Sequence, residues 1–342
     1  MRMMRLLVLF SFTLLILHVD VFPVFAKAPT TPKIVFTSAR DGNREIYIMN
    51  PNGSEQVRLT NHPGNDLNAV WSPTGEQILF TSDRDGLRDL YLMNPDGSNI
   101  RRVFKKELKR ANTRRDGPTW SPDGKQIAYM YTNWDKDIDV IRITNLDEQK
   151  ENFVAKGLDP AWSPDGAEIA CTTFDNQMTL INVRTGARKG ILPRKELGGQ
   201  LMPSWSAAAD KLAFAWNNNP LPPDFNRERG DKLPKEWTNK RTIYIVNRDG
   251  TGLKQLVDEA GPMAQYPELS PNGEEVLYTQ VVEERHQIFK VDVSSGVQTQ
   301  LTHVGMPRFG NFGGDWFDPA YGLPVSPQPE LLTILWGKVK RE

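Results

Sequence analysis

The strongest constraint on this chain is a turn-and-strand segment that returns along its length. WSPTGEQILF begins at Trp71, WSPDGKQIAY at Trp120 and WSPDGAEIAC at Trp162, and weaker copies read WSAAADKLAF from Trp205 and LSPNGEEVLY from Leu269. A sixth anchor, Trp316, has no full repeat behind it. The anchors lie 49, 42, 43, 64 and 47 residues apart. Periods of this size indicate a propeller blade or a helical repeat.

Short runs of β-branched and aromatic residues between the turns favour strands over helices. Examples are IVFTS at 34–38, EIYIMN at 45–50, ILFTS at 78–82 and DLYLMN at 89–94. In Ser-Pro-Asp-Gly the proline presets the first turn residue, the aspartate can hydrogen-bond the backbone ahead, and the glycine accepts a positive φ. Further turn signals lie at 40–42, 84–86, 50–55, 94–99 and 247–252. They predict four strands per repeat, joined as a meander.

The second strands of the repeats align in six copies, which contain Ile34, Ile78, Ile127, Ile169, Leu212 and Val276. The predicted fold is therefore all-β: a six-bladed β-propeller of four-stranded antiparallel blades, over residues 34–319. The first copy lacks its innermost strand, and the segment at Trp316 is a first strand without a repeat. We expect this C-terminal strand to complete the first blade and close the ring. The tail, 320–342, holds one more strand candidate at 331–336, whose place stays open.

The first 26 residues have the layout of a secretory signal peptide. MRMMR precedes the apolar run LLVLFSFTLLIL, and small residues suited to cleavage end at Ala26. The apolar run is shorter than the roughly 20 residues that span a bilayer as a helix. We expect residues 27–33 to form a short linker and the mature chain to be periplasmic or secreted, without a membrane span. An uncleaved anchor is the alternative.

Charge and cysteine content exclude several classes of protein. Without Arg2, Arg5 and Asp20 of the leader, 40 basic and 41 acidic residues remain, so nothing global points to nucleic acid. Cys171 is the only cysteine, which excludes an internal disulfide. We expect it to be a small buried hydrophobic residue, with a reactive thiol as the alternative. Stability must come from a hydrophobic core, which a chain of this length can build.

The SPDG-type turn, followed by a strand, DG and an IY-MN-DG segment, resembles the propeller repeats of the TolB family, the periplasmic component of the bacterial Tol-Pal system. The resemblance covers roughly residues 34–319, although WSAAAD in the fifth repeat lacks the proline and the glycine. TolB carries an α/β domain ahead of its propeller, whereas only residues 27–33 precede the first strand here. We therefore expect a TolB-like protein, and its part in the Tol-Pal system stays open. Related propellers gate prolyl oligopeptidase-type proteases, but this chain contains no Gly-x-Ser-x-Gly motif.

Three long connections are the places where we expect function, because all three fall on the same face of the predicted ring. They span residues 104–117, 217–241 and 302–315. The first carries a basic run that can dock an acidic partner or an anionic glycan: Lys105, Lys106, Lys109, Arg110, Arg114 and Arg115. A solvated loop is the alternative. The second carries Phe225 and Trp237, which either anchor a partner or fold back and pin the loop.

Histidine gives the one hint of an enzyme. His62 and His303 begin blade-to-blade connections at nearly the same repeat position, in blades that ring closure makes neighbours. With Asp66 or Asp315 they would complete a two-histidine, one-carboxylate metal site. A resemblance to propeller lyases of acidic sugars gives the alternative function, a metal-dependent lyase or hydrolase. The simpler interpretation is ordinary connection chemistry, and we expect no catalytic residue and no cofactor, with a divalent metal in the channel left open.

The favoured function is a non-enzymatic, exported binding platform. It would engage a protein or glycan of the cell envelope through the loop-rich face and the channel mouth. A rigid ring holds variable loops in fixed relative positions, which lowers the ordering cost of binding.

Overall fold

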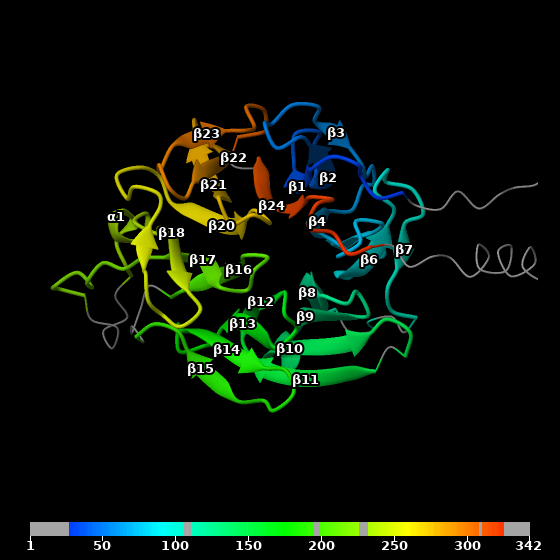
Figure 1. Cartoon of the computed structure of the whole chain (residues 1–342), viewed down its shortest axis with the longest axis horizontal. Coiled ribbons are helices and arrows are strands. Elements are labelled where there is room, and N and C mark those ends of the chain that lie inside the picture. The colour runs from blue at the N-terminus through cyan, green and yellow to red at the C-terminus, as the bar shows by residue number, and fades with distance from the viewer. Residues whose placement is uncertain are drawn as a thin grey trace, which may run out of the picture.

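The computed structural model describes residues 27–324, except 106, 107, 109, 110, 149, 194–198, 226–231, 308 and 309. Within these residues, six four-stranded antiparallel sheets stand as blades around a common axis (Figure 1). The predicted six-bladed, all-β propeller is confirmed. The expected signal peptide, 1–26, and the strand candidate at 331–336 lie outside the described residues. No helix in the described part is long and apolar enough to cross a membrane.

Each blade is a meander whose strands follow one another from the channel outward. Blade 1 consists, from the innermost strand to the outermost, of β24 (Asn311–Phe317), β1 (Lys33–Ser38), β2 (Glu45–Met49) and β3 (Val57–Arg58). Blade 2 consists of β4 (Asp66–Trp71), β5 (Ile78–Ser82), β6 (Asp89–Met93) and β7 (Arg101–Arg102). Blade 3 consists of β8 (Thr113–Trp120), β9 (Gln126–Asn133), β10 (Ile138–Asn145) and β11 (Glu151–Lys156).

The other three blades follow the same order. Blade 4 consists of β12 (Leu158–Trp162), β13 (Glu168–Thr172), β14 (Met178–Asn182) and β15 (Arg188–Gly190). Blade 5 consists of β16 (Leu201–Trp205), β17 (Lys211–Trp216), β18 (Thr242–Asn247) and β19 (Lys254–Gln255). Blade 6 consists of β20 (Ala264–Leu269), β21 (Glu275–Val282), β22 (Arg285–Asp292) and β23 (Gln298–Gln300). In the described part of the chain, two connections contain a short helix: a 3-10 helix, Trp134–Lys136, and α1, Lys235–Thr238.

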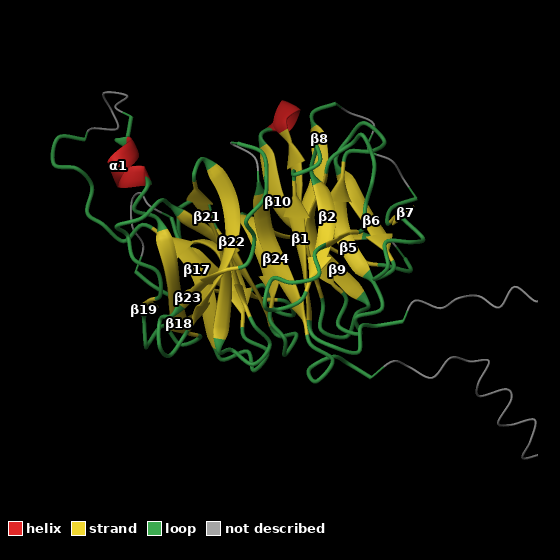
Figure 2. Cartoon of the chain, turned by 90° about the horizontal axis from the view of Figure 1, so that it is seen from above, coloured by secondary structure: helices red, strands yellow, loops and turns green. Residues whose placement is uncertain are grey.

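The two ends of the ring differ. The turns between first and second strands and between third and fourth strands, such as 72–75 and 94–98, form one end, which we call the turn face. The turns between second and third strands and the blade-to-blade connections form the other end, the loop face. Figure 2 shows α1 and the 3-10 helix together on the loop face. The described residues of the insert, 217–225 and 232–241, lie there too, between β17 and β18 as predicted.

The core consists of apolar layers between adjacent blades. In one layer, Ile34 and Phe36 of blade 1 pack with Leu277 and Ile288 of blade 6. Cys171 is fully buried in another layer, and burial raises the pKa of its thiol to about 12, so the thiol stays protonated at neutral pH. The predicted buried cysteine is confirmed.

The C-terminal strand closes the ring as predicted. β24 pairs antiparallel with β1, with Trp316 opposite Ile34 and Asn311 opposite Ser38 (Figure 1). Phe317 then extends into blade 2, where its ring centroid lies 5.4 Å from that of Trp71. The strand therefore contacts the blades on both sides of the joint.

The SPxG turns are held by one repeated hydrogen bond. The serine hydroxyl accepts the backbone N–H of the residue that follows the turn glycine by two positions, as in Gln126 to Ser121 (2.9 Å) and Glu168 to Ser163 (2.9 Å). Gly124 and Gly166 have φ values of +70° and +74°. In the fifth blade Ala209 occupies the equivalent position with φ +55°, a conformation that costs an alanine roughly 1–2 kcal/mol.

We expect Ala209→Gly to raise the free energy of unfolding by about 1 kcal/mol, because glycine adopts a positive φ without a steric penalty. Denaturant unfolding of the purified chain measures the change. Ala208→Gly is the matched control: Ala208 lies in the same turn without a positive φ, so that substitution should destabilise. Equal effects of the two substitutions would contradict the strain at Ala209.

Candidate functional site

A β-bulge recurs in all six inner strands, three residues before each anchor. The pairing register with the second strand shifts at this point in every blade. The residues there all have a positive φ: Asn68, Gly117, Asp159, Met202, Tyr266 and Gly313. Bulges re-aim side chains, and these six lie around the channel on the loop-face side of the anchors, since every inner strand runs from that face toward the turn face.

A charged cluster gathers at this mouth, with residues from five blades: Arg44, Asp116, Asp159, Arg241 and Tyr266. Burial raises the pKa of the Tyr266 hydroxyl, and the charges of the other four all act on it. Asp116 accepts hydrogen bonds from Asn68 Nδ2 (2.8 Å) and from Arg88 Nη1 (2.9 Å). The charged cluster thus brings carboxylate and guanidinium groups of different blades together across the channel.

Asp159 is the most perturbed member of the charged cluster. Burial raises the pKa of its carboxyl to about 6, and the neighbouring Asp116 adds to the rise. The backbone N–H of Met202 and the Arg241 guanidinium act in the opposite direction but do not cancel the effect of burial. The Asp159 carboxyl therefore titrates close to neutral pH.

An aromatic group flanks the charged cluster. The ring of Phe312 lies edge-on to Tyr266, with centroids 6.4 Å apart, and its centroid is 4.5 Å from that of the His286 ring. The Arg44 guanidinium lies over the Phe312 ring, 5.7 Å from its centroid. Burial and the Arg44 charge lower the pKa of His286, which favours the neutral imidazole. The mouth therefore offers apolar contact beside its charges.

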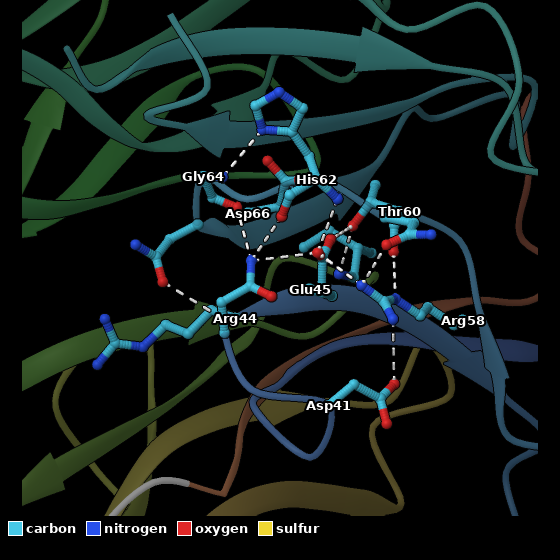
Figure 3. Close-up of polar contacts among 12 residues, drawn as sticks. Asp41, Arg44, Glu45, Arg58, Thr60, His62, Gly64 and Asp66 are labelled. Carbon is cyan, nitrogen blue, oxygen red and sulfur yellow. Dashed lines mark hydrogen bonds and ion pairs between the residues drawn. The ribbon is translucent and has the colours of Figure 1, made fainter. Parts of the chain in front are cut away.

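His62 and Asp66 belong to a hydrogen-bond network centred on Glu45 (Figure 3). The Glu45 carboxylate accepts from the Thr60 hydroxyl (2.5 Å), the His62 backbone N–H (2.9 Å) and Arg58 Nη2 (2.8 Å). The Nδ1 atom of His62 accepts the Gly64 N–H at 2.9 Å. These contacts fold the connection from blade 1 to blade 2, so His62 has a structural role there.

The other residues of the hypothetical metal site have contacts of their own. Asp66 is fully buried and pairs with Arg84 at 2.8 Å. His303 is exposed on the loop face, whereas Asp315 lies toward the turn-face end of β24 and accepts the Trp71 N–H at 2.5 Å. Over the described residues, no three histidine, cysteine, aspartate or glutamate side chains are grouped as ligands of one metal ion.

The basic residues of the run 105–115 differ in their surroundings. Lys106, Lys109 and Arg110 lie outside the described residues, and Lys105 is exposed. Arg115 is buried in β8, where Nη1 contacts both oxygens of Asp89 (3.1 Å each) and Nη2 contacts Glu151 (2.5 Å). Such an ion pair fixes blade 3 against blade 2. Arg114, which points the other way from the strand, lies over the ring of Trp134 at 5.0 Å.

The two aromatic residues of the insert differ. Trp237 is buried, and its Nε1 donates to the Pro220 carbonyl at 2.7 Å while its own carbonyl accepts from Asn217. It therefore pins the insert onto blade 5. Phe225 is half-buried, next to residues that the structure does not describe.

Two exposed aromatic residues on the loop face were not predicted from the sequence. Trp134 is 58% exposed in the 3-10 helix of blade 3, and Phe174 is 56% exposed in the equivalent turn of blade 4. The signal in the sequence was an aromatic residue inside a polar turn, in NWDKD and TFDNQ. These turns are short, whereas the prediction rested on the long connections.

Comparisons with known proteins agree with the predicted resemblance. Residues 19–159 match the TolB beta propeller domain, and the repeats are TolB-like as expected. No curated protein sequence matches the chain.

Three solved structures illustrate the shared fold. TolB from Acinetobacter baumannii superposes with a TM-score of 0.65 at 16% identity, over 83% of this chain and 66% of that one. Putative TolB from Agrobacterium tumefaciens gives 0.57 at 17% identity, over 84% and 92%. A chain of the nidogen/laminin complex gives 0.59 at 11% identity, over 83% and 98%. The chain thus spans just under two thirds of the Acinetobacter TolB, and the likeness is one of fold.

We expect the free energy of unfolding to rise as pH falls from about 6 to about 4, because Asp159 binds a proton more tightly folded than unfolded. Asp159→Asn should reduce this rise, to which the buried carboxyls of Asp315 and Glu268 also contribute because their pKa values are raised, and should stabilise the chain at pH 7 by on the order of 2 kcal/mol. Denaturant unfolding across the pH range measures both effects. The exposed Asp147 supplies the control Asp147→Asn, which should leave the wild-type curve unchanged. A variant that keeps the full pH dependence would show that another group causes it.

Proposed function

We propose that this TolB-like propeller is an exported, non-enzymatic binding platform that holds a protein of the cell envelope against its loop face and the adjoining channel mouth. The observation that carries the proposal is the exposure of Trp134 and Phe174 on turns of adjacent blades. Large apolar side chains that face solvent from rigid turns are typical of interaction sites, where tryptophan is enriched among the residues that dominate affinity.

The chemistry of the loop face favours a protein over a glycan. Val304 and Met306, on the connection from blade 6 to blade 1, are also exposed. Aliphatic side chains bury well against a protein surface, whereas a sugar needs hydrogen-bonding groups beside each aromatic ring. Arg114, stacked on Trp134, adds a positive charge next to the apolar contact.

The ring supplies preorganisation. Trp134 and Phe174 follow closely on β9 and β13, whose residues pair throughout with their neighbours. Little conformational freedom is then lost when a partner binds, so more of the contact energy appears as affinity. The charged cluster at the mouth would align a partner, because complementary charges act on orientation and association rate more than on affinity.

The test is the double variant Trp134→Ala, Phe174→Ala. We expect it to lose at least tenfold in affinity for an envelope protein captured by the wild-type chain, because truncated aromatic anchors cost more than about 1.4 kcal/mol. Pull-down from an envelope extract identifies the partner, and titration calorimetry with the purified partner measures the affinity.

Phe153→Ala is the matched control, since Phe153 is 62% exposed on the outer strand β11 and not on the loop face. Wild-type affinity in this control, with thermal unfolding unchanged in both variants, supports the proposal. Equal losses in both variants, or none in the double variant, would overturn it. If the chain instead bound a purified glycan, and this binding required Trp134 and Phe174, the partner would be a glycan and not a protein.

A further inference from the structure

A cavity opens at the turn face, opposite the proposed docking surface. Its volume is about 460 Å³, within the range of small-molecule sites. Its wall contains all six anchors, the five tryptophans Trp71, Trp120, Trp162, Trp205 and Trp316 and also Leu269, together with prolines of the SPxG turns. Leu323 lies at its rim, where its backbone N–H donates to the Pro73 carbonyl at 2.9 Å. We call this cavity the turn-face pocket.

The residue immediately before each anchor also lines the turn-face pocket, once per blade: Val70, Thr119, Ala161, Ser204, Glu268 and Asp315. Four of these six are small or apolar. The two carboxyl groups come from blades 6 and 1, which ring closure places side by side through β20 and β24. The repeat therefore builds a ring of inward positions, and two neighbouring members are acids.

Among the described residues that line the turn-face pocket, the charged ones are all acidic: Glu268, Asp315 and Asp318. Over the described residues, neither Glu268 nor Asp315 takes part in an ion pair within 4.0 Å. Burial raises the pKa of the Asp315 carboxyl to about 7, although the hydrogen bond from the Trp71 N–H acts to lower it. Burial and the Asp315 charge raise the pKa of Glu268. When the pair ionises, no cation of the described chain lies close enough to compensate its charge.

We propose that the turn-face pocket binds an organic cation, an alkylammonium or guanidinium group, with its charged end between Glu268 and Asp315 and its stem against the tryptophan rings. A carboxylate pair and aromatic walls both stabilise such a group, through charge-assisted hydrogen bonds and cation–π contact. A metal ion fits less well, since the described residues place no third acidic or histidine ligand in a group with this pair. The site does not depend on the function proposed for the loop face.

The cation can be a free amine or a lysine side chain of a peptide, and two probes distinguish these sources. Spermidine and the peptide acetyl-Gly-Lys-Gly-amide are titrated into the mature chain at pH 8 by calorimetry and by tryptophan fluorescence. Saturable binding of either probe supports the site and names the source. Binding of neither probe would overturn it, as would equal binding of acetyl-Gly-norleucine-Gly-amide, which lacks the charge. Tighter binding of Ca²⁺ that displaces both probes would also overturn it.

Glu268→Gln tests the position of the cation, because it removes a charge and keeps the size of the side chain. We expect affinity to fall about tenfold or more, with thermal unfolding showing a folded chain. Asp315→Asn should act similarly, although Asp315 also holds the Trp71 N–H. Glu236→Gln, an exposed carboxylate on α1 at the other face, is the control and should leave affinity unchanged. Wild-type affinity in Glu268→Gln would overturn the proposal.

The pH profile gives an independent readout. A cation binds the ionised pair, so wild-type affinity should rise about tenfold from pH 6 to pH 8, as the Asp315 carboxyl with a pKa of about 7 loses its proton. A flat profile would mean that the probe binds elsewhere, and would overturn the site.

Discussion

The pairing of β24 with β1 is the interaction on which the rest of the molecule depends. It joins the two ends of the described chain in one sheet, so blade 1 is built from both (Figure 1). Because β24 also packs against blades 6 and 2, one strand completes two apolar layers. Both mouths of the channel need it as well: Phe312 lies at the loop face, while Asp315 and Trp316 line the turn-face pocket. A ring that opened at this joint would lose both sites together.

The fold was predictable from sequence because its determinants repeat. Turn residues, strand lengths and the anchor tryptophans recur with a period, and each copy strengthens the interpretation of the others. The sites were not predictable in this way, because they consist of positions at which the copies differ. Asp116, Asp159 and Tyr266 lie far apart in sequence and meet only where the ring brings the bulged ends of their strands together. These residues lie three or four positions before an anchor in the sequence, but that spacing indicates a site only once it is known which end of the strand faces which mouth.

Local sequence patterns misled for a related reason. A run of like charges does not reveal orientation: Arg114 and Arg115 are adjacent on β8, yet one stacks on an exposed tryptophan and the other forms a buried ion pair. The Leu-Thr pair shortly before each of the two histidines, in LTNH at 59–62 and LTH at 301–303, has a structural explanation as well. Thr60 and Thr302 both accept the N–H of an isoleucine, at 2.9 Å, and both donate to the residue before it, Glu45 in blade 1 and Gln287 in blade 6. Because Gln287 supplies an amide oxygen where Glu45 supplies a carboxylate oxygen, this connection requires a hydrogen-bond acceptor but not a negative charge. His62 and His303 follow these threonines in sequence, but their side chains take no part in the threonine hydrogen bonds.

Comparing equivalent positions of the blades also distinguishes residues that the fold requires from residues that it does not require. At the position before the anchor, blades 2 to 5 use Val70, Thr119, Ala161 and Ser204, so a small or apolar residue satisfies the fold there. Glu268 and Asp315 occupy equivalent positions, where burial opposes their ionisation and no protein cation offsets it within the described chain. Asp159 stands likewise at a bulge where glycine and methionine serve in other blades. Buried carboxylates that the architecture does not need lower stability, and natural proteins carry such costs mainly where a site requires them. Both mouths meet that description, but their charges differ. The loop-face mouth contains arginines beside its acids, whereas the described residues that line the turn-face pocket include no basic side chain.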